Sequence, residues 1–239
     1  MSAAKIHATA IVEKGAKIGS DCEIGPGAIV GPEVEIGAGC IIGPRAVLQG
    51  RLKMGVKNRI GVGAVLGGEP QDLAYQGAAS GVIIGNGNTF REYVTIHRGT
   101  KEGTDTVIGN DCFLMVGAHV AHNCRLGNGV TLVNNVLLAG YVEIEEKAFL
   151  GGAVVVHQFV RIGKLAMVRG QTRVGMDLPP YCMAVATNGV CGLNAVGLRR
   201  AGVKPENRKS LQRVYEEFFF GGKNRQQALE SIRQGSDAK

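Results

Sequence analysis

A large apolar residue at every sixth position is the property of this sequence that most constrains its fold. Of the 29 positions divisible by six between Ile6 and Val174, 26 hold a large apolar side chain, and Asp72, Ala78 and Glu102 are the exceptions. The residue that follows is often glycine, and the fourth residue after the apolar one is usually small or branched. This pattern is typical of the hexapeptide repeat of a parallel β-helix, in which each repeat supplies one short strand and one turn.

Three hexapeptides make one triangular coil of 18 residues, so about nine coils are expected over residues 1–180. In such a coil the large apolar residue fills the interior, the small residue packs near a corner, and glycine eases the turn. Glycine accounts for 37 of 239 residues, roughly twice the average usage of about 7%. We therefore predict an all-β main domain, a parallel β-helix.

Two segments interrupt the repeat, and the end of the chain abandons it. Residues 68–83 and 100–106 are rich in glycine and polar residues, so both are predicted to be loops extruded from the prism, where rigid scaffolds tend to carry function. Beyond residue 180 apolar residues recur at helical spacing, which predicts a small C-terminal helical domain over residues 181–239. From Leu198 onward there are ten basic and five acidic residues, so this segment carries +5 of the net charge of +7.

The composition excludes several classes of protein. No apolar stretch approaches the roughly 18 residues of a membrane span, and the first residues lack the long apolar segment of a secretory signal. We expect a cytoplasmic protein whose six cysteines are reduced thiols. Its basic residues alternate with acidic ones and are not interleaved with aromatic residues, so no nucleic-acid partner is expected. No Cys-X-X-Cys pair is present that would indicate a zinc knuckle.

Residues 18 apart should lie above one another, and this places several polar residues together. His122, Gly140 and Gln158 share one such column, and Tyr141 stands beside Gly140. A histidine at an outward turn, taken singly, is most often only solvated. Four of the five histidines nevertheless fall in the middle and later coils. The position of His122 beside a glycine favours a role as a general base, since histidine transfers protons near neutral pH. The histidine spacing does not indicate a zinc site.

These residues occur in motifs that resemble those of the bacterial UDP-N-acetylglucosamine 3-O-acyltransferases, which begin lipid A synthesis. The resemblance covers nearly the whole chain. It rests on the segments Gln71–Leu73, Val94–Thr100, His119–Cys124, Asn134–Asn135, Leu138–Gly140, Val156–Phe159, Pro179–Tyr181 and Gly197–Arg200. The resemblance implies a left-handed β-helix, a homotrimer with active sites in clefts between neighbouring prisms, and no metal or cofactor.

The resemblance also implies a role for each matching residue. His122 matches the general base that takes the proton from the glucosamine 3-hydroxyl, which attacks the thioester of a 3-hydroxyacyl chain on acyl carrier protein. The backbone N–H of Gly140 matches the donor to the oxyanion. Gly170 matches a position that limits acyl-chain length, and the basic C-terminal helices would face the acidic carrier protein. The expected substrate-binding residues are Gln71, Asp72, Leu73, Ala74, His97, His119, Tyr141, His157, Gln158, Asn194 and Arg200.

Four positions depart from the pattern of the family. Tyr141 stands where many members have histidine, Ala74 where many have lysine, Asn123 where many have aspartate, and Val196 where many have glutamate. Two other functions stay open from the sequence. One is a paralogue that acylates an amine of an amino-sugar nucleotide, because the same base can serve a hydroxyl or an amine. The other is a β-helix protein that is non-catalytic or a metal-dependent hydratase.

Overall fold

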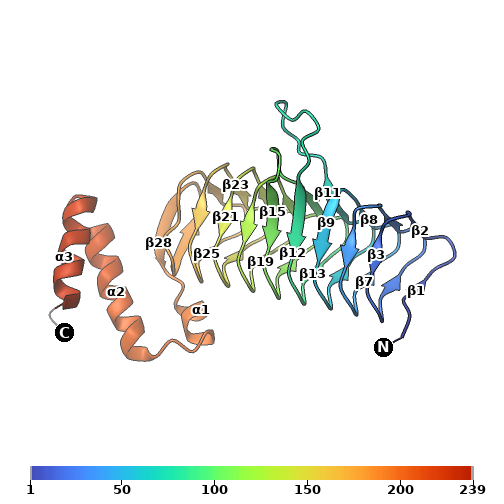
Figure 1. The fold of residues 1–239 in the computed structure, drawn as a ribbon. Coiled ribbons are helices and arrows are strands. Elements are labelled where there is room, and N and C mark those ends of the chain that lie inside the picture. Colours follow the sequence, from blue (N-terminus) through green and yellow to red (C-terminus); the bar gives the residue numbers. More distant parts are fainter. Residues whose placement is uncertain (1, 238–239) are drawn as a thin grey trace.

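The computed structural model describes residues 2–237 and shows a triangular prism of short parallel strands with helices at one end (Figure 1). Three sheets form its sides. The first sheet contains β1 (Lys5–Ile6), β4 (Glu23–Ile24), β7 (Ile41–Ile42), β10 (Arg59–Ile60), β13 (Thr89–Phe90), β16 (Phe113–Leu114), β19 (Thr131–Leu132), β22 (Phe149–Leu150), β25 (Met167–Val168), β27 (Cys182–Val185) and β28 (Gly189–Leu193). The second contains β2 (Ile11–Val12), β5 (Ile29–Val30), β8 (Val47–Leu48), β11 (Val65–Gly68), β14 (Thr95–His97), β17 (His119–Val120), β20 (Leu137–Leu138), β23 (Val155–Val156) and β26 (Arg173–Val174). The third contains β3 (Lys17–Ile18), β6 (Glu35–Ile36), β9 (Arg51–Met54), β12 (Gly81–Ile84), β15 (Asp105–Ile108), β18 (Arg125–Leu126), β21 (Glu143–Ile144) and β24 (Arg161–Ile162).

The register of these strands confirms the period of six. Lys5 pairs with Glu23, so coils without insertions are 18 residues long. The offset rises to 30 where Arg59 pairs with Thr89, and to 24 where Thr89 pairs with Phe113. From β4 onward the second residue of each two-residue strand is buried, which places the apolar residues at multiples of six in the core, whereas Ile6 of the first coil is exposed. Every strand pair in the regular coils is parallel, as a helical winding of the chain requires.

The core also contains a pair of asparagine side chains at the position that is usually small. Asn58 and Asn88 are fully buried in adjacent coils. The Asn58 Nδ2 donates to the carbonyls of Gly55 and Gly85, and its Oδ1 accepts from the side chain of Asn88 at 2.9 Å. Because each amide is satisfied by its neighbour and by turn carbonyls, the polar pair is tolerated where an unpaired amide would be costly.

Both extruded loops leave the prism at the corner between the second and third sheets (Figure 1). The first is shorter than the sequence predicted, because β11 extends to Gly68 and β12 begins at Gly81, and the second lies two residues earlier than predicted, because β14 ends at His97 and β15 begins at Asp105. The loops therefore comprise residues 69–80 and 98–104. The longer strands at their bases form because Gly81 pairs with both Arg51 and Asp105, which lengthens the ladder beyond two residues.

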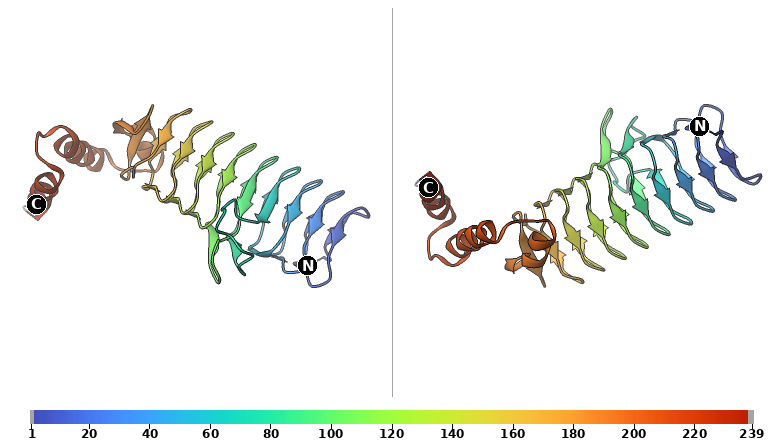
Figure 2. Two further views of the ribbon diagram at one scale, coloured as in Figure 1. Left: turned by 90° about the horizontal axis from the view of Figure 1, so that it is seen from above. Right: turned by 90° about the horizontal axis from the view of Figure 1, so that it is seen from below.

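The β structure continues past the expected domain boundary at residue 180. β27 pairs in parallel with β25, and β28 turns back to pair antiparallel with β27, so this hairpin ends the first sheet at Leu193. The helices follow as α1 (Ala195–Arg200), α2 (Pro205–Phe220) and α3 (Arg225–Asp237), and they lie beyond that end of the prism (Figure 2). Tyr215 of α2 is buried with the core residues. None of the helices described for this chain is long and apolar enough to cross a membrane.

Candidate active site

The imidazole of His122 lies directly over Gly140 of the next coil. His122 follows β17 and Gly140 follows β20, and the carbonyl of His122 accepts the N–H of Tyr141 at 3.0 Å. A Cβ atom built on Gly140 would overlap the His122 ring, with the carbon between the two ring nitrogens as its nearest contact. The histidine is 9% exposed. The absence of a side chain at position 140 therefore allows the imidazole of His122 to pack against the prism.

Both nitrogens of His122 face polar side chains. Nδ1 lies 3.1 Å from Oδ1 of Asn123, and Nε2 lies 3.9 Å from Oδ2 of Asp72. Asn123 has φ of +60°, a left-handed conformation that asparagine adopts more readily than most residues. Tyr141, one coil further on, has the same φ. The Tyr141 ring meets the His122 ring edge-on, with centroids 5.4 Å apart, and it stacks on the Phe159 ring, with centroids 5.0 Å apart.

Asp72 reaches this site from the loop 69–80, which Arg98 fixes in place. The Arg98 guanidinium donates to the Gly67 carbonyl at 3.1 Å, to the Tyr75 hydroxyl at 3.0 Å and to Glu69 at 3.0 Å. Asp72 in turn accepts from the N–H of Ala74 at 2.9 Å. The loop is therefore held from the end of β14, and the Asp72 carboxylate is presented to the ring of His122.

His97 and His119 form a second polar pair on the second sheet, next to His122. Their rings meet edge-on with centroids 4.8 Å apart, and Nδ1 of His119 lies 2.7 Å from the Thr95 hydroxyl. Burial is the main cause that lowers the pKa of His97 to about 4, and His119, His122 and Arg98 add to it. Burial, followed by His122, also lowers the pKa of His119. Both rings are therefore neutral near pH 7 and can exchange hydrogen bonds with a polar ligand.

The structure confirms the column of His122, Gly140 and Gln158, because the N–H of Phe159 donates to the Gly140 carbonyl at 3.1 Å. Gln158 and His157 are both exposed, and His157 Nδ1 lies 3.1 Å from the Gln158 carbonyl. Neither side chain contacts the His122 ring within the described hydrogen bonds and ring contacts. Gln71, Leu73 and Ala74 are exposed on the same loop as Asp72.

Asn194 and Arg200 lie on the C-terminal part of the chain and are not joined to His122. The Asn194 side chain caps α1 by accepting the N–H of Gly197 at 2.9 Å, and it donates to the carbonyl of Leu165 at 2.9 Å. Arg200 is exposed at the end of α1. The roles of both residues in nucleotide binding stay predictions.

Gly170 also stacks as predicted, on Gly152 of the preceding coil. A Cβ atom at position 170 would lie 3.1 Å from the Gly152 carbonyl oxygen, and the residue is exposed. Its role in limiting chain length stays a prediction.

Sequence reasoning missed the part that Arg98 and Thr100 play in assembling the site. Both occur in a motif that carries the family resemblance, yet no role could be derived for them. Arg98 fixes the loop of Asp72, and Thr100 hydrogen-bonds to Asn123 and Tyr141. Their contacts run across the extruded loops, where the six-residue spacing gives no information about neighbours.

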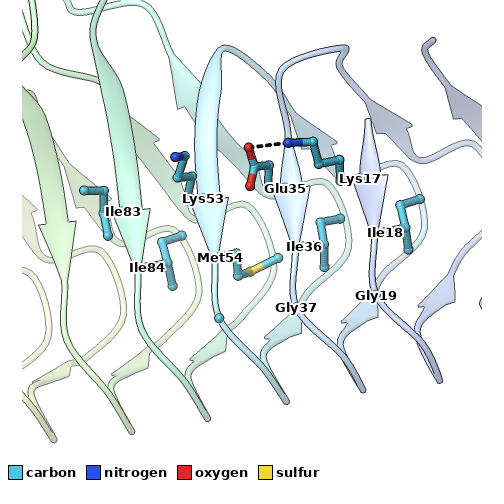
Figure 3. A pocket seen from close by; sticks show the side chains of 11 residues that line it. Lys17, Ile18, Gly19, Glu35, Ile36, Gly37, Lys53, Met54, Ile83 and Ile84 are labelled. Atoms are coloured by element: carbon cyan, nitrogen blue, oxygen red, sulfur yellow. Dashed lines mark hydrogen bonds and ion pairs between the residues drawn. The ribbon is translucent and has the colours of Figure 1, made fainter. Parts of the chain in front are cut away.

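The structure contains one cavity beside His122 and its polar neighbours, and another on the early coils of the prism. The cavity beside His122 has a volume of about 630 Å³ and is lined in part by Asn123, Tyr141 and Phe159. The other, of about 490 Å³, lies on the first coils of the third sheet, where Lys17 and Glu35 form an ion pair at 3.1 Å (Figure 3). No residue predicted for the site lines this second cavity. Within residues 2–237, no three His, Cys, Asp or Glu side chains are grouped so that they could hold a metal ion.

Comparison with known proteins identifies the family. Residues 15–50 and 105–140 match a family described as bacterial transferase hexapeptide (six repeats), and residues 177–239 match one described as Udp N-acetylglucosamine O-acyltransferase, domain 2. Acyl-[acyl-carrier-protein]–UDP-N-acetylglucosamine O-acyltransferases from Gloeothece citriformis and Rippkaea orientalis are 45% and 50% identical over 192 and 189 residues. These matches cover 80% and 78% of this chain, and 70% and 68% of the relatives.

Solved structures agree with the sequence matches. The UDP-N-acetylglucosamine acyltransferase from Bacteroides fragilis superposes with a TM-score of 0.93 at 36% identity, over 96% of this chain and 90% of that one. The enzyme from Campylobacter jejuni gives 0.91 at 32% identity, over 97% and 90% of the two chains. The predicted fold is confirmed as a left-handed parallel β-helix followed by a small helical part. The chain belongs to the acyl-[acyl-carrier-protein]–UDP-N-acetylglucosamine O-acyltransferase family.

Proposed function

We propose that this chain transfers a 3-hydroxyacyl group from acyl carrier protein to the 3-hydroxyl of UDP-N-acetylglucosamine, the reaction that begins lipid A synthesis. The observation that carries the proposal is the placement of His122 over Gly140, with Asp72 beside one ring nitrogen and Asn123 beside the other. A buried histidine held at Nδ1 and open toward a polar loop at Nε2 is suited to act as a general base.

In the proposed reaction Nε2 of His122 takes the proton of the sugar hydroxyl as its oxygen bonds to the thioester carbonyl carbon. The backbone N–H of Gly140 donates to no acceptor among the described residues, so this donor is available to the oxyanion of the tetrahedral intermediate. Collapse of the intermediate breaks the C–S bond, and the proton on His122 passes to the departing thiolate. His97, His119 and Asp72 line the same corner and would hold the sugar and the acyl chain.

We propose further that three copies assemble, with each site between two prisms. Leu137 and Val155 pair with one another on the outer face of the second sheet, and Leu137 pairs with His119 on its other side. Both aliphatic side chains are exposed although they adjoin the histidine pair. A neighbouring prism packed on this face would cover them and close the site on its open side.

The carrier protein and the compartment belong to the same proposal. The exposed basic residues of α1 and α2 would face the acidic carrier protein, as complementary charge steers such encounters. We assign the activity to the cytoplasm, which fits the six unpaired cysteines, since free thiols persist in reducing compartments.

The test is an assay of the purified protein with UDP-N-acetylglucosamine and acyl carrier proteins loaded with 3-hydroxyacyl chains of increasing length. Mass spectrometry should detect the sugar nucleotide with one added 3-hydroxyacyl group. Mild alkali should remove that group, since an ester is cleaved where an amide is not. A parallel assay supplies a UDP-sugar that has a free amine, and an alkali-resistant product from that substrate alone would indicate the amine-acylating paralogue instead. If no chain length gives any acylated UDP-N-acetylglucosamine, the proposed function is wrong.

A further inference from the structure

We propose that Thr100 is a positioning residue, which orients the side-chain amide of Asn123 and thereby fixes the tautomer of His122 that can act as a base. This inference rests on the proposed function for its catalytic consequence, while the tautomer itself can be measured without turnover. The direction of each hydrogen bond around Asn123 determines how its amide is turned and which nitrogen of His122 carries the proton.

Two donors from Thr100 converge on the same atom of Asn123. The backbone N–H of Thr100 lies 3.1 Å from Oδ1, and its hydroxyl oxygen lies 2.9 Å from Oδ1. A backbone N–H can only donate, so the atom that faces it must be the amide oxygen and not the amide nitrogen. Thr100 therefore determines which end of the Asn123 amide points into this corner.

The same oxygen faces the ring of His122, and this determines where the ring proton lies. Oδ1 of Asn123 is 3.1 Å from Nδ1, and an amide oxygen can only accept. Nδ1 must therefore carry the proton and donate. In the neutral ring the lone pair is then on Nε2, the nitrogen that faces Asp72. A reversed amide would favour the opposite tautomer, in which Nε2 is protonated and cannot accept the proton of a hydroxyl.

Tyr141 completes the chain of hydrogen bonds and holds Thr100 in turn. The Thr100 hydroxyl has one proton, which it donates to Asn123, so the Tyr141 hydroxyl at 3.0 Å must be the donor to Thr100. The Tyr141 ring is itself held between Phe159, on which it stacks, and the edge of His122. The tyrosine that stands where many relatives have histidine therefore supports the base through Thr100.

The loop that carries Thr100 is anchored on both sides, so the contact does not depend on a free segment. The N–H of Gly99 donates to the Gly81 carbonyl, and the Thr104 hydroxyl donates to the Lys101 carbonyl at 2.7 Å. The N–H of Asn123 donates to the Thr106 hydroxyl at 2.8 Å. Both partners of the Thr100–Asn123 contact are thus fixed to neighbouring coils.

The need for Thr100 follows from the amide at position 123. An aspartate there could present only acceptors, so Nδ1 would donate to it whichever way it turned. Asparagine has one donor end and one acceptor end, and an additional group must select between them. Thr100 supplies that selection from the loop 98–104.

The direct test measures the tautomer of His122 by nitrogen-15 NMR of the histidine-labelled protein, with His122→Ala to assign the signal. We expect the Nδ1–H form in the wild type and in Thr100→Ser, which keeps the hydroxyl. Thr100→Val keeps the backbone N–H but loses the second donor to Oδ1 and the link to Tyr141, so part of the population should shift from the Nδ1–H to the Nε2–H form. An Nε2–H form in the wild type, or an unchanged single tautomer in Thr100→Val, would overturn the proposal.

Kinetics provide the second readout. Thr100→Val should lower kcat by about tenfold, less than the roughly 10²–10⁴-fold typical of losing the base itself, with little change in KM for the sugar nucleotide. Thr100→Ser should restore most of the rate. In the Asn123→Asp background the Thr100→Val change should cost little, since a carboxylate needs no orientation. An equal loss in both backgrounds would indicate a merely structural role for Thr100.

Thr131→Val is the matched control, because Thr131 lies on the first sheet, away from this corner, and its side chain has no described hydrogen bond. If the tautomer is as inferred but no variant has activity to lose, the proposed function fails while the assignment of Thr100 stands. If the enzyme is active and the tautomer is reversed, the assignment of Thr100 fails alone.

Discussion

His122 and Gly140 occupy the same column in successive coils, and the ring of the first fills the space that a side chain on the second would take. The glycine does not have a positive φ, so its backbone conformation is open to other residues. What excludes a side chain is the imidazole alone. The predicted base and the predicted oxyanion donor therefore depend on the same space, which stays free for the ring only while position 140 has no side chain.

Gly140→Ala should remove most of the activity and leave the fold intact. The added methyl group meets a side chain that can rotate, so the ring of His122 moves away while the coil keeps its register. We expect a fall in kcat that approaches the roughly 10²–10⁴-fold attributed to a general base. Gly175→Ala is the control, because a Cβ there would meet nothing closer than 3.4 Å. Full activity in Gly140→Ala would contradict this account of the site.

His122→Ala should reduce turnover by about 10²–10⁴-fold without dissociating the assembly, since the side chain acts on a proton and does not fill the core. The measurement is kcat with size determination of the same sample. His7→Ala, an exposed histidine of the first coil, should behave as the wild type. Near wild-type turnover in His122→Ala would mean that another group is the base.

The protein should be a trimer at all concentrations at which it is active, and light scattering on dilute samples checks this. Leu137→Lys and Val155→Lys place charges on the face that we expect to be covered, so each should weaken assembly and activity together. Val56→Lys, which adds the same charge to an exposed turn between β9 and β10, should do neither. The observation of an active monomer would refute the trimer.

Gly170→Met should shift donor preference toward shorter acyl chains. A methionine side chain would add bulk above the stacked pair Gly152 and Gly170, where we expect the end of the acyl chain to lie. The assay compares rates over carrier proteins loaded with chains of increasing length. Gly170→Ala is the control, because it makes the same backbone contact without the long side chain. An unchanged length profile in an active Gly170→Met enzyme would leave this glycine only a role in the turn.

Stability should fall as the pH decreases from about 6.5 toward 4. Burial lowers the pKa of His97 to about 4, whereas the unfolded chain binds a proton near 6.5. Between these values the unfolded state binds more protons, so the free energy of unfolding decreases with decreasing pH. Denaturant unfolding as a function of pH measures this slope. His97→Gln should make it shallower without abolishing it, because the pKa of His119 is lowered too. An identical slope would show that His97 does not contribute.

Much of the fold could be predicted from the sequence because each coil position has a fixed neighbour 18 residues away. The column of His122, Gly140 and Gln158 follows from that offset, as does the burial of Phe90. Where the chain leaves the period, the position of a residue in the sequence no longer predicts its neighbours. The contacts of Arg98 with Tyr75 and of Thr100 with Asn123 cross the two loops, and they could be found only in three dimensions.

The hairpin at the end of the prism was missed for a related reason. β27 and β28 pair antiparallel, so the neighbour of Cys182 is Leu193. That spacing occurs nowhere in the six-residue repeat and could not be extrapolated from it. The ring contact between His97 and His119 was not predicted either. It depends on the loop 98–104, which lengthens the coil between them so that Thr95, and not Lys101, lies opposite His119.

The two extruded loops are the sites at which this architecture tolerates insertions and deletions. One residue lost from a regular coil would turn the remainder of that strand inside out, exchanging core side chains for solvent-facing ones. The loops at residues 69–80 and 98–104 are outside that constraint, because the chain re-enters the next sheet in phase whatever their length. Divergence in substrate within such a scaffold is therefore limited to two kinds of mutation, replacement within a column and lengthening or shortening at this one corner.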